Sequence, residues 1–454
     1  MLKSINPTTG KIIQSYQSHS EKGVKQIINA VDKTWHHWRS TSFKHRSNSM
    51  QNLSSLLKSK KVELAQLMAL EMGKVKKEGI AEIEKCAWVC DYYAQNAELH
   101  LQNEDISTEA SRSFISYQPI GTVLAVMPWN FPFWQVFRFL APTLMAGNTA
   151  VLKHASNVPG CAMAIEELVR EAGFPENVFR TLLIGSGLVK NVIKHNAIKA
   201  VSLTGSTPAG KSVASIAGGE LKKCVLELGG SDPYIILKDA DLKDAAKKCA
   251  AGRLLNSGQS CIAAKRFIIV EDAYPEFLEH FTHEMNAAYF GDPCDEQSTM
   301  GPMARTDLRD ELHQQVLDSV EKGAEVILGG EIPFRKGAFY PPTILENVRP
   351  GMPAYDEELF GPVASVIQVK DEKEAIRVAN DTEFGLGAAI FTNDIKMGEN
   401  IAEMQIDAGC CFVNDFVKSD PRLPFGGIKE SGYGRELSSQ GIKEFMNAKT
   451  VVVK

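Results

Sequence analysis

Residues 121–154 read GTVLAVMPWNFPFWQVFRFLAPTLMAGNTAVLKH, and this stretch decides the fold. Two short apolar runs, at residues 123–127 and 150–153, are typical of buried strands, and the apolar segment 133–145 between them is long enough for a helix. A strand, a crossover helix and a second strand form the repeating unit of parallel sheets. The stretch therefore predicts a parallel sheet with a helix packed on its face.

The same alternation extends along the chain in both directions. The first hundred residues carry apolar side chains at helical spacing, and beyond residue 154 the pattern predicts a helix at 160–172 and strands at 179–184, 200–203 and 224–228. A second α/β stretch follows residue 228, with predicted helices at 242–255 and 275–289 and a strand at 267–270. Residues 330–362 are rich in Pro and Gly and are expected to form loops around a ligand site. This order of elements indicates an α/β fold with a Rossmann-like first sheet, the usual setting for a dinucleotide.

Length and composition restrict the class of protein further. A chain of 454 residues is too long for one hydrophobic core, so we expect at least two domains. A net charge of −5 gives no reason to expect a nucleic-acid or polybasic membrane partner. The first residues, MLKSINPTTGKII, lack the apolar core of a signal peptide, and the most apolar run, at 131–145, contains Arg138. The nine cysteines are dispersed without CxxC spacing, which argues against a disulfide framework or a bound metal, and we expect a cytoplasmic enzyme.

The C-terminal segment has a separate signal. Residues 445–453 end in the β-prone run TVVV at 450–453. An apolar terminal strand leaves an edge that tends to pair with another chain. We therefore expect this strand to pair with another subunit.

Five short strings group reactive residues with glycines. NSGQSC ends at Cys261, where a glycine-containing loop can expose a thiol to a substrate. PWNFP at 128–132 places the Asn130 amide where it can donate to an oxyanion. VLELGG at 225–230 places Glu227 at the end of a strand, where apolar surroundings raise the pKa of a carboxyl group. The remaining two strings are EELFGP at 357–362 and PFGGIKESG at 424–432.

In this order the five strings resemble the aldehyde dehydrogenase superfamily, and the resemblance runs from about residue 5 to the C-terminus. It implies a cofactor-binding domain at 1–228, which an oligomerisation strand interrupts near 107–119. It also implies an α/β catalytic domain at 229–425 and a return segment with an oligomerisation tail at 426–454. These elements together form the aldehyde dehydrogenase fold, and the resemblance implies a homodimer or homotetramer.

The resemblance also assigns roles to residues. Cys261 is the expected nucleophile, Glu227 the general base, and Asn130 with the Cys261 N–H the oxyanion hole. The thiolate adds to an aldehyde, hydride passes to nicotinamide, and water activated by Glu227 hydrolyses the thioester. Because all three residues are present, a non-catalytic protein on the same fold is disfavoured. The expected cofactor contacts from the strings are Trp129, Leu228, Glu358 and Phe360.

Two segments bear on the choice of cofactor. LTGSTPAG at 203–210 places Gly205 and Ser206 between a strand and a helix, so helix N–H groups can face a pyrophosphate. Lys153 resembles the family lysine that contacts the adenosine ribose. NAD-specific relatives commonly carry Glu three residues later, whereas this chain has Ser156, so NADP is expected to be preferred and NAD accepted. The alternative is that Ser156 only caps the following helix.

Gln135 and Arg138 interrupt the apolar segment 131–145 and share one helix face, because they lie three residues apart. An arginine in such a helix needs an anionic partner or solvent. In the superfamily this face lines the substrate tunnel, and Arg138 there resembles succinate-semialdehyde dehydrogenases, which bind the distal carboxylate with arginine. Ser419, five residues before Pro424, matches the serine of semialdehyde enzymes. We therefore expect succinate semialdehyde as the substrate.

Alternatives to this substrate assignment stay open. The substrate could be a longer semialdehyde such as glutarate semialdehyde, and Arg138 could pair with a structural Asp or Glu while Ser419 is only a loop residue. Coenzyme A could take the thioester in place of water, although Glu227 as a water activator argues against it. Ala263 occupies the position of a second cysteine that forms a redox-switch disulfide in some succinate-semialdehyde dehydrogenases, so this switch is expected to be absent.

Overall fold

The computed structural model describes residues 1–454, and the stretch from residue 121 forms a six-stranded sheet in the order β17-β9-β8-β5-β6-β7. Strands β5 to β9 are parallel, as predicted, and β17 pairs antiparallel with β9, with Gly432 opposite Glu227. Because the order reverses at β5, the carboxyl ends of β5 and β8 lie at a topological switch point, where ligands bind in open parallel sheets. The strands of this sheet are β5 Thr122–Met127, β6 Thr149–His154, β7 Phe179–Thr181, β8 Ile198–Thr204, β9 Lys223–Glu227 and β17 Gly432–Tyr433.

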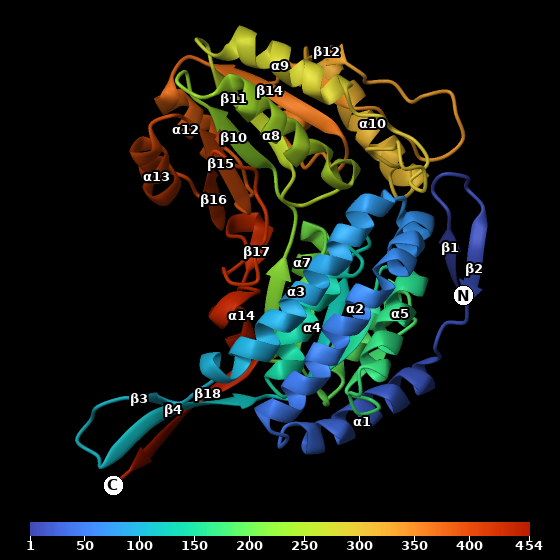
Figure 1. The fold of residues 1–454 in the computed structure, drawn as a ribbon, viewed down its shortest axis with the longest axis vertical. Coiled ribbons are helices and arrows are strands. Elements are labelled where there is room, and N and C mark those ends of the chain that lie inside the picture. The colour runs from blue at the N-terminus through green and yellow to red at the C-terminus, as the bar shows by residue number, and fades with distance from the viewer.

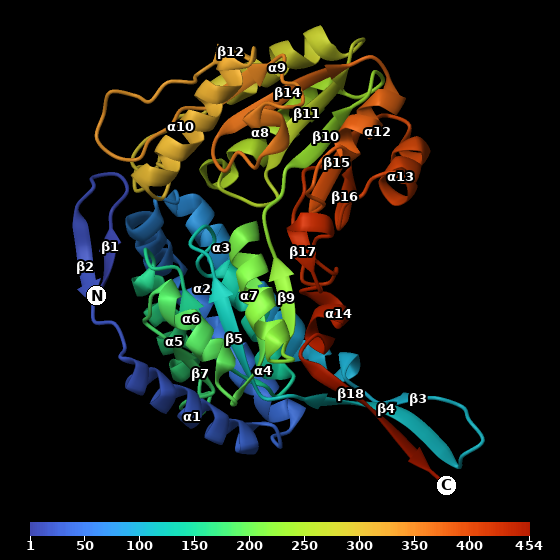
Figure 2. The ribbon, with the colours of Figure 1, turned by 180° about the vertical axis from the view of Figure 1, so that it is seen from behind.

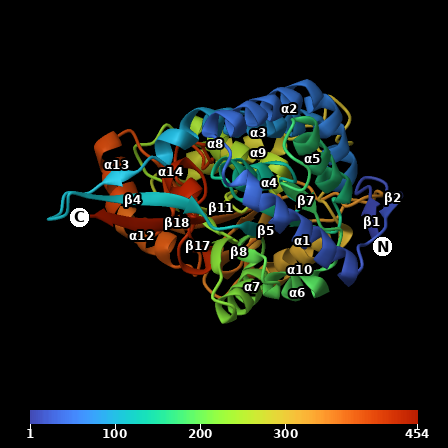
Figure 3. The ribbon, with the colours of Figure 1, turned by 90° about the horizontal axis from the view of Figure 1, so that it is seen from below.

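Helices cover both faces of this sheet. Successive residues of a strand point to opposite faces, so an apolar strand has side chains to bury on each face. Val123 and Ala125 of β5 belong to a core with α2, α3, α4 and α5, whereas Leu124 belongs to a core with α1, α6 and α7. Figure 3 shows α2 and α3 on one side and α7 on the other. The helices are α1 Glu21–Trp38, α2 Phe43–Met72, α3 Lys76–His100, α4 Trp134–Met145, α5 Pro159–Glu171, α6 Val189–Lys194 and α7 Thr207–Gly219.

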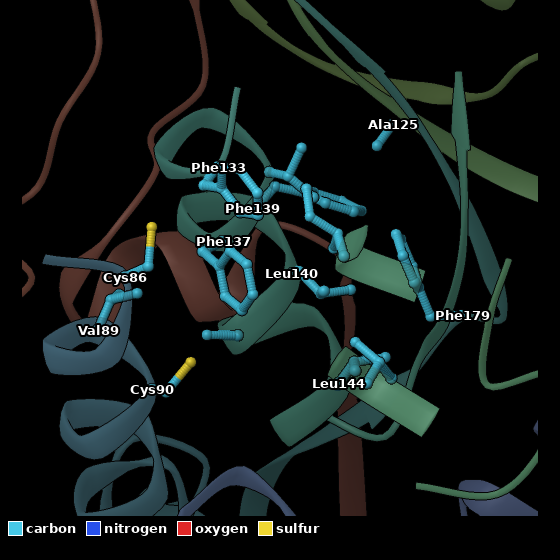
Figure 4. Packing of buried hydrophobic residues seen from close by; sticks show 14 of the residues in the cluster. Cys86, Val89, Cys90, Ala125, Phe133, Phe137, Phe139, Leu140, Leu144 and Phe179 are labelled. Atoms are coloured by element: carbon cyan, nitrogen blue, oxygen red, sulfur yellow. The ribbon is translucent and has the colours of Figure 1, made fainter. Parts of the chain in front are cut away.

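The packing of α3 against α4 positions the helix that carries Gln135 and Arg138. Phe137 and Leu140 of α4 lie in one buried cluster with Cys86 and Cys90 of α3 (Figure 4). Each of these side chains is fully buried, so α4 is held rigidly at the carboxyl end of β5.

The second sheet has seven strands in the order β12-β13-β14-β11-β10-β15-β16, all parallel except the β12–β13 pair. Its core is separate from those of the first sheet. The strands are β10 Asp232–Ile236, β11 Ala264–Val270, β12 Glu325–Leu328, β13 Thr343–Glu346, β14 Val363–Val369, β15 Gly387–Phe391 and β16 Cys410–Val413. The helices are α8 Leu242–Leu254, α9 Tyr274–Asn286, α10 Thr306–Glu321, α11 Pro353–Asp356, α12 Glu372–Asn380 and α13 Ile395–Met404.

The two large sheets lie in two bodies, one above the other in Figures 1 and 2. The chain crosses from the first body to the second between β9 and β10, and it returns between β16 and β17. The domain boundaries expected at 228/229 and 425/426 stay a prediction. Short 3-10 segments lie at Ser186–Leu188, Leu255–Gly258 and Lys429–Ser431.

A three-stranded sheet projects from the lower body and carries the C-terminus (Figure 1). Its strands are β3 Glu104–Asp105, β4 Arg112–Pro119 and β18 Met446–Val453, and α14 Ser438–Lys443 precedes β18. β18 pairs with β4 over its whole length, and pairing of its other edge with another subunit stays a prediction. The β4 strand supplies the partner within the same chain, and the other edge of β18 forms the rim of the sheet.

Two expectations about secondary structure need correction. The first hundred residues are not all helical, because β1 Leu2–Ile5 and β2 Ile12–Tyr16 form an antiparallel hairpin. Residues 330–362 are not loops alone, since they include β13 and α11. These four elements are short, and their hydrophobic patterns are too weak to compete with the neighbouring Pro and Gly signals. No helix has the length and apolar character needed to cross a bilayer.

Candidate active site

Cys261 lies in a loop with unusual backbone geometry, just before β11. Asn256 and Ser257 both have a φ of 56°, and Gly258 has a φ of 72°, so three successive residues are left-handed. A side chain at Gly258 would collide with the Gly361 carbonyl, because an added Cβ would lie 2.3 Å from that oxygen. Asn256 holds the loop, since its Nδ2 donates to the Asn130 carbonyl at 2.7 Å and to the Gln259 carbonyl at 3.1 Å. Strained backbone of this kind is concentrated at functional sites.

Cys261 stands between two cavities. One cavity, of about 290 Å³, is lined by Trp129, Asn130, Gly205, Ser206, Leu228, Glu358 and Phe360, among others. The other, of about 190 Å³, is lined by Lys85, Gln135, Arg138, Ser419 and Phe425, among others. Cys261 is the one residue that lines both cavities. The thiol can therefore be reached by two molecules at once, one from each side.

The Cys261 thiol is not acidic in this environment. Burial raises the pKa of Cys261 to about 12, while the positive charges of Arg138 and Lys265 act in the opposite direction. A thiol whose pKa is raised needs a base to become a nucleophile.

Glu227 lies at the end of β9 and lines neither cavity, so its role as this base stays a prediction. It is 2% exposed, and neither carboxyl oxygen has a hydrogen-bond partner. Burial, followed by the nearby charge of Glu436, raises the pKa of Glu227 well above its usual value of 4.5, as its apolar surroundings predicted. Gly426 permits the close packing, because an added Cβ there would lie 2.7 Å from Glu227 Oε1. A carboxyl group in this state accepts protons more readily than an exposed one.

Asn130 lies in the turn between β5 and α4. Its Nδ2 donates to the Gln259 carbonyl at 3.1 Å, which leaves the second N–H of the amide without a partner. His154 holds the turn, because its two ring nitrogens contact the Met127 carbonyl at 3.2 Å and the Pro132 carbonyl at 2.8 Å. The free N–H can donate to an oxygen atom near Cys261.

The lining of the larger cavity suits the pyrophosphate and a ring of a dinucleotide. Helix α7 begins after Ser206 with Pro208 in its first turn, so unpaired N–H groups face the cavity at its start. An added Cβ at Gly229 would lie 2.5 Å from Glu358 Oε2, so glycine leaves room for that carboxylate. Trp129 and Phe360 contact each other edge to face at 5.8 Å and form an apolar wall. Helix N–H groups for a pyrophosphate and an apolar wall for a ring are what such a cofactor requires.

Glu358 has a buried partner that the sequence analysis missed. Lys265 is 1% exposed, and its Nζ lies 3.2 Å from Glu358 Oε1 and donates to the Cys261 carbonyl at 2.8 Å. It therefore ties a cofactor-cavity carboxylate to the nucleophile loop. A lysine inside the apolar strand at 264–270 was the available signal.

Lys153 and Ser156 do not line the larger cavity. Lys153 lies at the carboxyl end of β6, beside β5, and burial lowers its pKa. Ser156 is exposed, and the residue preceding α5 is Val158, which makes no side-chain cap. The alternative that Ser156 only caps this helix is therefore wrong, and its contact with the cofactor stays a prediction.

In the smaller cavity, Arg138 already has a carboxylate partner. Its Nε pairs with Glu436, and the two side chains are 2% and 5% exposed. The guanidinium also lies 4.6 Å above the Phe425 ring and donates to Thr204 Oγ1 at 3.4 Å. The ion pair is the alternative that the sequence left open, and contact between Arg138 and a substrate stays a prediction. Glu436 was missed, although it follows the 424–432 string closely.

Lys85 is a second cation of this cavity that the sequence analysis missed. It comes from α3, and its Nζ donates to Ser419 Oγ at 2.9 Å. The ammonium also lies 4.5 Å from the centre of the Trp134 ring. No local pattern marks it, because α3 carries several lysines and the Ser419 contact spans 334 residues.

The geometry agrees with the comparison to known proteins. The model of the aldehyde dehydrogenase family matches residues 1–451. The chain belongs to this family. It is 48% identical to a probable succinate-semialdehyde dehydrogenase [NADP(+)] of Synechocystis sp., with 99% of each chain covered. It is 45% identical to the succinate semialdehyde dehydrogenase [NAD(P)+] Sad of Escherichia coli, covering 99% of this chain and 97% of that one.

Solved structures of the family have the same fold. The succinic semialdehyde dehydrogenase of Streptococcus pyogenes in complex with NADP+ superposes with a TM-score of 0.98 at 36% identity, over 100% of both chains. The aldehyde dehydrogenase fold expected from the sequence is therefore confirmed.

Proposed function

We propose that this chain oxidises succinate semialdehyde to succinate, with NADP+ as the preferred acceptor and NAD+ as a second one. The position of Cys261 carries the proposal, because it alone borders both the cavity at the start of α7 and the cavity that holds cationic side chains. The names of the relatives from Synechocystis and Escherichia coli support the same substrate and cofactors.

The first half-reaction forms a thioester. Glu227 takes the proton of the Cys261 thiol, and the thiolate adds to the aldehyde carbon. The oxyanion then accepts hydrogen bonds from the free N–H of Asn130 and from the backbone N–H of Cys261. When bound, the nicotinamide supplies the hydride acceptor. Cys261 keeps the acyl group as a thioester.

The second half-reaction releases the acid. Once Glu227 has released the thiol proton to solvent, it accepts a proton from water as the water oxygen attacks the thioester carbon. The C–S bond breaks, the carboxylic acid leaves, and the Cys261 sulfur recovers a proton. A carboxylate with a raised pKa suits both proton transfers, because each requires a base stronger than an exposed glutamate.

Two alternatives within the family make different products or use different substrates. A longer semialdehyde such as glutarate semialdehyde uses the same chemistry, and its kcat/KM relative to succinate semialdehyde separates the two substrates. A coenzyme A-acylating enzyme needs no water activator, so the presence of Glu227 disfavours that reaction. For the assembly, we infer a homodimer or homotetramer, because the free edge of β18 offers unpaired backbone groups to a second copy.

A steady-state panel tests the proposal. The aldehydes are succinate semialdehyde, glutarate semialdehyde, propanal and benzaldehyde, each measured with NADP+ and with NAD+. The expected result is the highest kcat/KM for succinate semialdehyde with NADP+, and an acid product that added coenzyme A does not change. Equal or higher kcat/KM for propanal or benzaldehyde overturns the substrate assignment.

A further inference from the structure

Lys265 is a buried charge that neither half-reaction uses. It is the second residue of β11, a strand that is buried throughout, and its side chain is 1% exposed. In the pairing of β10 with β11, Asp232 lies opposite Ala264 and the next residue of β10 lies opposite Arg266, so Lys265 has no partner on β10. A bulge of this kind redirects a side chain and is common next to active sites. The bulge lets Lys265 turn toward the nucleophile loop, residues 256–261.

All three N–H groups of the Lys265 ammonium have acceptors. Two acceptors are backbone carbonyls of the nucleophile loop, at 2.9 Å for Ser260 and 2.8 Å for Cys261. The third acceptor is Glu358 Oε1, at 3.2 Å. Because an ammonium has three donors, this set is complete. Lys265 is therefore fixed in position, and it joins the residue that carries the thiol to a carboxylate of the larger cavity.

Glu358 is held through one carboxylate oxygen and is free at the other. Its Oε1 accepts from Lys265 and also from the Gly230 N–H at 3.1 Å. No protein group donates to Oε2, which lies against Gly229, where an added Cβ would be only 2.5 Å away. Gly229 and Glu358 both line the larger cavity, whereas Lys265 does not. Lys265 thus fixes the carboxylate from outside the cavity and leaves Oε2 as an acceptor for hydroxyl groups of a bound dinucleotide.

The charge of Lys265 also acts on the thiol. Burial raises the pKa of Cys261 to about 12. The charges of Arg138 and Lys265 lower this pKa, whereas the charge of Glu358 raises it further. Because the thiolate is the reactive form of cysteine, removal of a nearby positive charge makes the thiol less reactive. The same ammonium therefore affects both the cofactor cavity and the nucleophile.

We propose that Lys265 is a positioning residue for both halves of the active site: it holds Glu358 in place for the dinucleotide, and it fixes the backbone that carries the Cys261 thiol. The inference rests on the proposed function, since it requires a dinucleotide whose hydroxyl groups contact Glu358. Lys265 lines neither cavity and so touches neither the cofactor nor the aldehyde. Its effects are expected to pass through Glu358 and through the nucleophile loop.

A double-mutant cycle tests the contact between Lys265 and Glu358. Lys265→Met, Glu358→Gln and the double variant are compared with the wild type for the dissociation constant of NADP+, measured by isothermal titration calorimetry without aldehyde. Each single change is expected to weaken binding by about tenfold, and the double change by about the same factor, because Lys265 acts through Glu358. A loss in the double variant equal to the product of the two single losses overturns the inference.

Alkylation of Cys261 tests the contact with the nucleophile loop. The enzyme without cofactor is treated with iodoacetamide at one pH, and mass spectrometry follows the peptide that contains Cys261. Lys265→Met is expected to lower the alkylation rate by about three- to tenfold, because the thiol loses a nearby positive charge. Glu358→Gln removes a negative charge, so its rate is expected to equal or exceed that of the wild type. A faster reaction in Lys265→Met indicates a loosened protein and overturns the inference.

Two variants complete the comparison. Lys60→Met removes a lysine that pairs with Glu171 at 2.6 Å near the surface and borders neither cavity, so both measurements are expected within about twofold of the wild type. Lys265→Gln keeps an uncharged donor at the site. If circular dichroism shows that Lys265→Met does not fold, the same cycle and the same alkylation are measured on Lys265→Gln, with losses expected in the same direction.

The outcomes separate the inference from the proposed function. A wild-type enzyme that binds NADP+ and oxidises succinate semialdehyde, together with a Lys265 variant that matches it in NADP+ affinity and in alkylation rate, overturns the inference and leaves the proposed function standing. A wild-type enzyme that binds neither NADP+ nor NAD+ overturns the proposed function, and the inference with it.

Discussion

Replacing Arg138 with methionine is expected to destabilise the folded protein, whether or not Arg138 contacts a substrate. Arg138 and Glu436 are 2% and 5% exposed, and Arg138 is the only cation within ion-pair distance of that carboxylate. Breaking a buried pair by removing one partner costs about 3–5 kcal/mol, because the remaining charge stays buried. Arg138→Met should therefore lower the free energy of unfolding by about that amount.

The same variant should slow turnover of charged and uncharged aldehydes alike. The positive charge of Arg138 lowers the pKa of Cys261 and of Glu227, so its loss leaves the thiol harder to ionise whatever the substrate. The double variant Arg138→Met/Glu436→Gln removes both charges and should recover most of the lost stability, since an uncharged pair of similar volume carries no desolvation penalty.

Urea unfolding followed by tryptophan fluorescence, together with kcat/KM for succinate semialdehyde and butanal, measures both effects. The reasoning is refuted if Arg138→Met is as stable as the wild type and loses activity only on succinate semialdehyde. In that case Arg138 holds the substrate, and its pairing with Glu436 contributes little.

Three other predictions concern the nucleophile, the base and the cofactor. Cys261→Ala should abolish turnover, and Glu227→Gln should slow it by about a hundredfold or more, because thiol ionisation and thioester hydrolysis both lose their base; near wild-type turnover in Cys261→Ala would end the covalent mechanism. Because Glu227 must be deprotonated and burial raises its pKa, kcat/KM for butanal should fall as the pH drops through a midpoint well above 4.5, and Glu227→Gln should lack this acidic limb. Ser156→Glu should lower the NADP+ to NAD+ ratio of kcat/KM by about tenfold or more through repulsion of the 2′-phosphate, and an unchanged ratio would contradict the role of Ser156.

The elements around the catalytic residues could be predicted because their signals are local. The strands predicted at 123–127 and 150–153 agree with β5 Thr122–Met127 and β6 Thr149–His154 to within one residue at each end. Each is a short apolar run next to a glycine or a turn, and burial on both faces keeps it apolar throughout. The β1–β2 hairpin was missed, because Ile5, Ile12 and Ile13 are exposed and no apolar face marks the strands.

The expected nucleophile and base could be named for the same reason. Cys261 and Glu227 stand in strings that contain glycines. A side chain at these glycines would collide with nearby atoms, as at Gly258, which packs against Gly361 of another string. Lys265 and Lys85 belong to no string. Their partners, Glu358 and Ser419, come from other parts of the chain, and a lysine in a helix or strand gives no local sign of such a partner.

Arg138 shows how far the sequence argument reaches. A positive charge in an apolar helix requires an anionic partner, and this requirement can be recognised in the sequence. It does not say whether the anion is a substrate or a carboxylate of the protein, because both satisfy it equally. Glu436 shows that the protein supplies one carboxylate for Arg138, whereas contact between Arg138 and a substrate stays a prediction. Because only a substrate contact depends on the charge of the aldehyde, the comparison of Arg138→Met on succinate semialdehyde and butanal separates the two anions.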